Sequence, residues 1–190
     1  MDPRQIIKRC KELKDKRDNW DSIWEEVAHF VLPTKSDFFT KSSTARNRNE
    51  DLYDSTAVTS NRTLASGLHG ALTAPSGRWF HIRFREEALN NSDEATEWLE
   101  DSINRIYKSI EESNFNSEIN ELYLDLCCFG TAALLVEQSS QDADSKLNFR
   151  TIHLSEFAVA ENVDGKIDTV YRKLKFTARQ ATQMWPDIDL

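Results

Sequence analysis

Cysteine is scarce in this sequence of 190 residues, which contains three: Cys10, Cys127 and Cys128. An odd number with two adjacent members does not make the disulfide framework of a small secreted domain, and no Cys-x-x-Cys pattern occurs. Neighbouring thiols are also poor joint ligands for one metal ion. We therefore expect packed, free thiols in a protein made in a reducing compartment, and no metal site.

Long apolar runs are also missing. No segment approaches the ~18 apolar residues of a membrane-spanning helix. The amino-terminal stretch MDPRQIIKRCKELKDKRD lacks the apolar core of a signal peptide. We expect a chain that has no membrane partner.

An excess of positive charge is absent. The formal net charge is −8, whereas proteins that coat DNA or RNA present a basic surface. The acidity is local, because residues 86–125 carry twelve acidic side chains against two basic ones, and the rest of the chain sums to +2. We interpret the acidic residues as the solvated outer faces of helices.

Catalytic motifs are missing as well. Gly67-x-x-Gly70 lies within a predicted helix and has no following Lys-Ser/Thr, so it is not a phosphate loop. Ser66 lacks the Gly-x-Ser-x-Gly elbow, and the paired cysteines lack the basic neighbours of an activated thiol. The four histidines have no metal-ligand spacing: His29, His69, His81 and His153. We predict no catalytic residue, no cofactor and no enzyme activity.

The sequence does contain a long helical pattern at its start. Asp2-Pro3 is a helix-start pair, and apolar residues recur at steps of three and four from Ile6 to Val31. Pro33 ends the pattern. Residues 1–33 are therefore predicted to form one long amphipathic helix with charged outer faces.

A polar, mildly basic stretch without periodicity follows at residues 34–53. We predict a flexible loop there, ordered by a partner or simply solvated. Its cations are candidates for contact with a partner or with DNA: Lys35, Lys41, Arg46 and Arg48.

Residues 54–130 are predicted to be a mainly helical region. Helical periodicity indicates helices over about 55–72, 91–113 and 117–129. Between the first two, alternation of apolar residues predicts a short strand near 79–84.

The first of these helices has slender surface and is followed by a bulky aromatic pair. Each glycine inside a helix costs ~1 kcal/mol relative to alanine, so we expect that Gly67 and Gly70 allow a neighbouring helix to approach closely. Pro75 turns the chain, and Trp79 and Phe80 are expected to lock the next segment into the core. We predict that these five residues form a structural packing joint that sets the angle between helices.

Periodicity changes from 3.6 to 2 after residue 130. Residues 131–176 are predicted to form an antiparallel β region, with one hairpin turn at Asp164-Gly165. Residues 177–190 begin a further helix, and the chain looks truncated there. Helices followed by a mostly antiparallel β meander predict an α+β fold.

Four stretches together resemble a known family. They are WDSIWEEVAHFVLP (20–33), LASGLHGALTAPSGRWFHIRF (64–84), DLCCFGTAALLVEQ (125–138) and FRTIHLSEFAVAENVDGKIDTVYRKLKFTARQA (149–181). In this order they resemble the head-to-tail connecting, or portal, proteins of short-tailed bacteriophages. Members of that family run to several hundred residues and continue into a stem and a clip, so this chain resembles mainly their outer wing region.

The resemblance implies a structural subunit of a closed ring, usually twelve-fold, at one capsid vertex. Such a ring is a conduit for DNA packaging and ejection. Its implied partners are further copies of itself, major capsid and scaffold proteins, tail adaptor proteins, terminase and viral double-stranded DNA that passes without sequence specificity. The implied location is the virion, after assembly in the bacterial host cytoplasm. ATP hydrolysis in that family belongs to the terminase, and an acidic protein suits a passage to which phosphates should not stick.

Other functions remain open from the residues alone. A nucleic-acid-binding module would use the loop at 34–53 as its arm, and its affinity for DNA would fall steeply with salt. A protein-interaction module would differ from a portal subunit mainly in not assembling into a ring. A soluble enzyme would need a site that none of the motifs above reveals.

Overall fold

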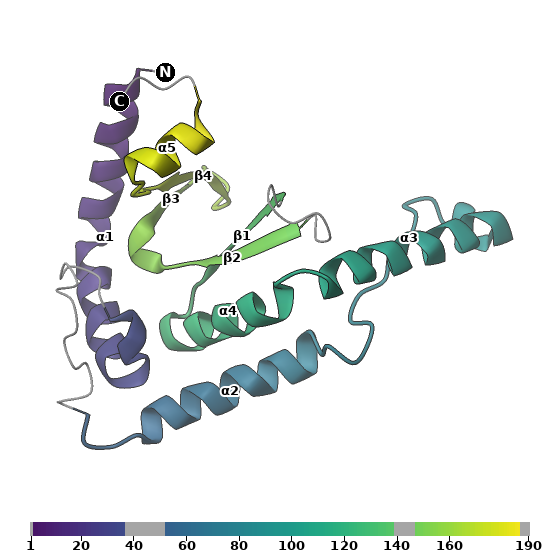
Figure 1. Ribbon diagram of the computed structural model, residues 1–190, viewed down its shortest axis with the longest axis horizontal. Coiled ribbons are helices and arrows are strands. Elements are labelled where there is room, and N and C mark those ends of the chain that lie inside the picture. Colours follow the sequence, from purple (N-terminus) through teal and green to yellow (C-terminus); the bar gives the residue numbers. More distant parts are fainter. Residues whose placement is uncertain (1, 37–51, 139–146, 187–190) are drawn as a thin grey trace. The chain divides into compact units, whose positions relative to one another are not determined.

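The structure is a computed structural model that describes residues 2–36, 52–138 and 147–186 (Figure 1). The chain divides into two compact units. Residues 22–152 form one, which we call the helical unit, and residues 1–21 with 153–190 form the other, the hairpin unit. Five α-helices and two small antiparallel sheets are described, so the α+β prediction is confirmed.

Helix α1 (Pro3–Val31) contributes residues to both units. Its start follows the local signal, because Asp2 Oδ1 accepts a hydrogen bond of 3.1 Å from the Arg4 amide. The short 3-10 helix η1 (Pro33–Lys35) comes directly afterwards. Proline cannot donate the next helical hydrogen bond, so α1 ends before Pro33.

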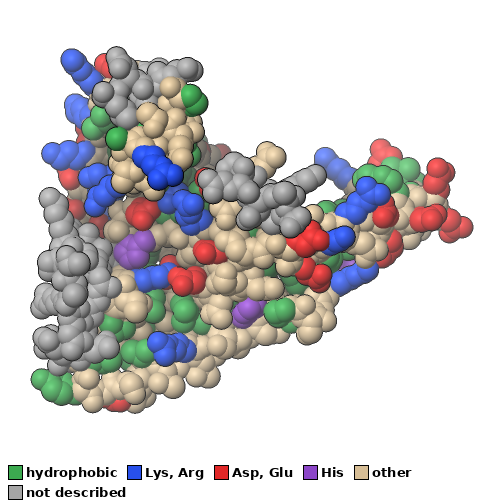
Figure 2. All heavy atoms as spheres, viewed as in Figure 1, with side chains coloured by type: hydrophobic (Ala, Val, Ile, Leu, Met, Phe, Trp, Pro, Cys, Tyr) green, Lys and Arg blue, Asp and Glu red, His purple; other side chains and the backbone are tan. Residues whose placement is uncertain are grey.

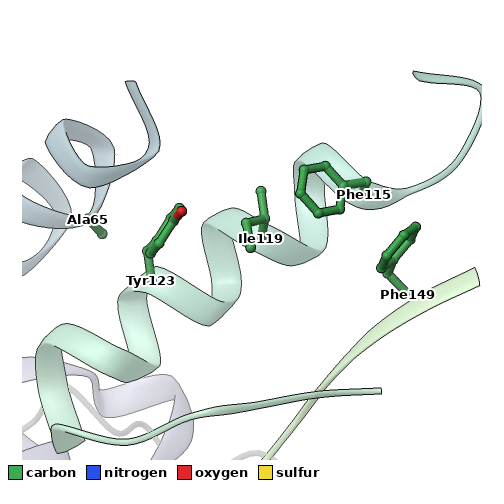
Figure 3. Packing of buried hydrophobic residues seen from close by; sticks show 5 residues of the cluster. All are labelled: Ala65, Phe115, Ile119, Tyr123 and Phe149. Atoms are coloured by element: carbon green, nitrogen blue, oxygen red, sulfur yellow. The ribbon is translucent and has the colours of Figure 1, made fainter. Parts of the chain in front are cut away.

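Helix α4 (Phe115–Phe129) is the centre of the helical unit. It packs against α2 (Thr56–Leu72) and against the sheet made by β1 (Ala133–Gln138) and β2 (Leu147–Ile152). The core lies between these elements, as Figure 3 shows, and consists of Ala65, Phe115, Ile119, Tyr123 and Phe149. Burying each large side chain of this set contributes about 1.5–3 kcal/mol.

Side chains fasten the beginning of α4 to β2. The Asn114 side chain donates to Phe149 O at 2.7 Å and accepts from the Phe149 amide at 2.8 Å. One turn later, Glu118 Oε2 accepts from the Thr151 amide at 2.6 Å. At the other end, Gly130 takes φ 75°, a left-handed conformation that glycine adopts without strain, and it ends the helix.

The hairpin unit holds β3 (Phe157–Glu161), β4 (Ile167–Arg172) and α5 (Ala178–Met184). The first part of α1 is joined to this hairpin by two cations. Lys14 Nζ donates to Ser155 O at 2.8 Å, and Arg17 Nη1 donates to Phe157 O at 2.6 Å. Burial lowers the pKa of Lys14 below its ordinary value. Sheet β3–β4 and sheet β1–β2 are separate, with the 3-10 helix η3 (Leu154–Glu156) between them in sequence.

The strand predicted near 79–84 is absent, since these residues join no β ladder. Side chains satisfy the backbone instead. The Phe80 amide donates to the Tyr107 hydroxyl at 2.8 Å, and that hydroxyl donates to Phe80 O at 3.1 Å. The Asn90 side chain bonds the amide and the carbonyl of Phe84 in the same two-way manner, at 2.9 and 3.0 Å. The alternating pattern therefore reflects an irregular segment held by side chains rather than by a neighbouring strand.

Candidate functional site

Trp79 and Phe80, which follow the predicted turn, contact other aromatic side chains. We call the cluster of Trp79, Phe80, Tyr107, Phe115 and Phe149 the aromatic joint. Trp79 stacks on Phe115 at 5.7 Å between ring centroids, with the planes only 6° apart. Phe80 stacks on Tyr107 of helix α3 (Asp93–Glu111) at 4.6 Å. Phe115 in turn meets Phe149 edge-on at 5.1 Å. The joint therefore connects the 75–84 segment to α3, α4 and β2, and each such pair contributes about 0.5–1.5 kcal/mol beyond area burial.

A hollow of about 540 Å³ lies beside the aromatic joint, between the turn at 74–79, α3 and α4. Pro75 and Trp79, two of the predicted joint residues, line it. Arg78 also lines it, and its guanidinium binds Glu100 at 2.9 Å and Asn104 at 2.6 Å. The lining offers an aromatic wall and amide groups. Trp79 exposes 39% of its surface.

The structure places Gly67 and Gly70 on the solvent side of α2. A Cβ atom built on either glycine would meet nothing within 4 Å. Within the described residues no helix lies close to either glycine, so a packing joint at Gly67 and Gly70 stays a prediction. Gly67 is two positions from Ala65, which places it on nearly the opposite face of the helix.

The face of α2 that does pack is marked by Ala65, which is fully buried. Polar groups flank it, because Asn61 donates to Leu124 O at 3.4 Å and the Thr73 hydroxyl lies 3.3 Å from that of Tyr123. Both faces of α2 are rich in small residues.

The candidate cation Lys35 is engaged within the helical unit. Its Nζ lies 2.7 Å from Asp125 Oδ1 and 3.0 Å from Glu121 Oε2. Burial alone would lower the pKa of Lys35, but hydrogen bonds and charge attraction from these carboxylates outweigh it and raise the pKa. The other three candidate cations lie outside the described residues: Lys41, Arg46 and Arg48.

Asp125 is the residue that sequence reasoning missed. The sequence predicts solvated acidic side chains over residues 86–125, yet Asp125 is 2% exposed. A signal was present, because Asp125 is the only charge in the apolar run LYLDLCCF at 122–129. A buried charge requires a partner, and Lys35 of η1 is one.

Cys128 lies close enough to this ion pair for both charges to affect its pKa. Burial, followed by the negative charge of Asp125, raises the pKa of Cys128 to about 12. Burial also raises the pKa of Cys127. Within the described residues no group of three or more histidine, cysteine or carboxylate side chains is arranged to bind a metal ion.

Charge is unevenly distributed on the surface. Figure 2 shows acidic side chains gathered over the region that Figure 1 labels α3. In the part of the chain that is described, no helix has the length and apolar character to cross a membrane.

The sequence of this chain is similar to those of known phage proteins. The model of the family described as bacteriophage head to tail connecting protein matches residues 3–190. A probable portal protein of Bordetella phage BPP-1 is 26% identical over 176 residues, which is 92% of this chain and 31% of that protein. The portal protein of Salmonella phage epsilon15 is 27% identical over 180 residues, 94% of this chain and 32% of that protein. The chain thus spans about a third of the length of these relatives, and it belongs to the bacteriophage head-to-tail connecting protein family.

Proposed function

We propose that this chain is part of a portal subunit that assembles with copies of itself into a closed ring at one vertex of a phage head. The ring is a conduit through which double-stranded DNA enters during packaging and leaves during ejection. The observation that carries the proposal is the family match over residues 3–190. The role is structural, and the chemistry of DNA translocation belongs to a separate terminase.

The exposure of tryptophan supports a role in assembly. Four of the five tryptophans expose more than a third of their surface: Trp20 (58%), Trp79 (39%), Trp98 (61%) and Trp185 (46%). Tryptophan is normally well buried in a folded chain and is enriched at the energetic centres of protein interfaces. These side chains are therefore suited to contacts with further copies or with capsid, scaffold and tail adaptor proteins.

The charge distribution fits a conduit better than a nucleic-acid-binding arm. Lys35, one of four cations proposed for such an arm, is bound to Asp125 and Glu121. The net charge of −8 repels phosphate rather than retaining it. We propose that the full-length protein forms a ring of twelve copies and contacts DNA weakly, without sequence preference. We also propose that the ring assembles in the host cytoplasm before it is incorporated into the virion.

Labelling of purified phage particles tests this proposal. A small epitope tag inserted at the hairpin turn by Gly165, where both flanking side chains are exposed, should be detected by gold-conjugated antibody in heads from which the tail has been removed. The proposal expects label at a single vertex per head. Label spread over the whole shell, or particles that lack the protein, would overturn it.

A further inference from the structure

The amino-terminal half of α1 has an exposed basic face, formed by Arg4, Ile7, Lys8 and Lys11. These positions follow the i, i+3, i+4, i+7 spacing that places side chains on one side of a helix. All four are exposed, and Ile7 exposes 69% of its surface. Lys8 has one carboxylate nearby, Glu12 at 3.9 Å, and both side chains of that pair are solvated.

Helix α3 has an exposed acidic face with the same spacing, formed by Glu94, Glu97, Trp98 and Asp101. Trp98 exposes 61% of its surface, and its ring is held in place by stacking on Phe84 at 5.9 Å. Asp101 pairs with Arg105 at 2.8 Å on the solvated surface. Like the basic face, this one has a single large apolar side chain accompanied by three charges of one sign.

The two faces are complementary in charge beyond these eight residues. Residues 3–17 carry seven basic side chains against two acidic ones, while α3 carries six acidic side chains against two basic ones. Two basic faces repel each other, and so do two acidic faces. A symmetric contact that pairs a face with itself is therefore unfavourable.

We propose that the basic face of one copy binds the acidic face of the next copy. Because each chain carries both faces, the contact is heterologous and can be repeated from copy to copy until the ring closes. This inference rests on the proposed function and adds the surfaces that would join neighbouring subunits. Ile7 and Trp98 lose water at the centre of the contact, and the charges around them set its direction.

Salt should weaken this contact, because screening limits the attraction between exposed charges to about 8 Å at physiological ionic strength. Charge reversal gives the sharper test. The variant R4E/K8E/K11E makes both faces acidic, and the variant E94K/E97K/D101K makes both faces basic. A third variant, which carries all six substitutions, exchanges the charge signs of the two faces and keeps the faces complementary.

The experiment measures the mass of the full-length protein in solution for these three variants and for a mixture of the first two. A control for R4E/K8E/K11E, the variant K166E/K173E/K175E, makes the same change in net charge at exposed lysines outside the faces. Circular dichroism checks that every variant is folded. We expect each single reversal to weaken self-association by about tenfold or more, since each replaces three attractions with three repulsions. The control should assemble like the wild type.

If association is restored when the two faces are again complementary, the contact is one between copies. The variant with all six substitutions should assemble again. Mixing R4E/K8E/K11E with E94K/E97K/D101K should also restore association, because the acidic face of one variant then meets the basic face of the other. If the wild type forms rings and the reversals behave like the control, this inference is wrong while the proposed function stands. If the full-length wild type forms no ring, both are wrong.

Discussion

Lys35 Nζ lies 2.7 Å from Asp125 Oδ1, and the Asp125 side chain is 3% exposed. The pair ties η1, which follows α1, to the third turn of α4. We call it the α1–α4 latch. It connects two segments 90 residues apart in the sequence.

Removing one partner of the latch should cost more than removing both. Lys35→Met removes the ammonium group that lies 2.7 Å from the buried Asp125 carboxylate, and we expect a loss of about 3 kcal/mol in the free energy of unfolding by urea. The double variant Lys35→Met with Asp125→Leu should recover most of that loss. Lys173→Met, at an exposed lysine, serves as the control. Equal stability of the single and double variants would contradict the latch.

The stabilisation that the latch contributes should be lost at alkaline pH. The pKa of Lys35 is raised in the folded state, so its contribution is complete below the ordinary lysine pKa of about 10.4 and is lost as pH rises through the folded value. Urea unfolding between pH 7 and pH 11 should therefore show a fall in stability at the alkaline end. The fall should be smaller in the Lys35→Met, Asp125→Leu double variant.

Cys128 should resist alkylation in the folded protein. Its pKa is raised from 9.0 to about 12, and the thiolate is the reactive form, so at pH 8 its iodoacetamide reaction should be roughly a thousandfold slower than that of an unperturbed thiol. Mass spectrometry of timed samples measures this. All three cysteines should react at similar rates in urea. Rapid modification of Cys128 in the folded chain would mean that its environment is not the apolar one described.

Tyr107→Phe should loosen the 78–84 segment. The substitution removes both hydrogen bonds to the backbone of Phe80, and we expect a loss of about 1–2 kcal/mol. Hydrogen exchange at the Phe80 amide should become faster. Tyr53→Phe is the matched control, because Tyr53 is 96% exposed and its loss of a hydroxyl should change neither quantity.

The two faces of α2 should respond oppositely to added bulk. Ala65 is fully buried against α4, so Ala65→Leu should destabilise the helical unit by about 1–3 kcal/mol. Gly67→Ala meets no atom within 4 Å and should stabilise the helix by up to ~1 kcal/mol. If Gly67→Leu were instead the more damaging substitution in the isolated subunit, the packing described for α2 would be wrong.

The sequence was most informative where structure depends on neighbours along the chain. The start of α1 follows from Asp2-Pro3, the hairpin turn from Gly165 with φ 74°, and the start of α5 from a capping box between Thr177 and Gln180. Each signal acts within four residues, so the residue types alone identify it.

Features that depend on residues far apart in the sequence were harder to predict from it. The 79–84 segment alternates like a strand, but Tyr107 and Asn90 satisfy its backbone, and no local pattern reveals that. The buried face of α2 depends on where Tyr123 lies, and the role of Lys35 depends on a carboxylate in another helix. The family resemblance was detectable because it rests on motifs in order along the chain, whatever their contacts.

The central claim is that the full-length protein forms a closed ring. Its mass in solution, measured at assembly concentration in several salts and compared with electron images of the same sample, tests this most directly. We predict a discrete oligomer whose images show a central hole. A monodisperse monomer under all of these conditions would contradict the account.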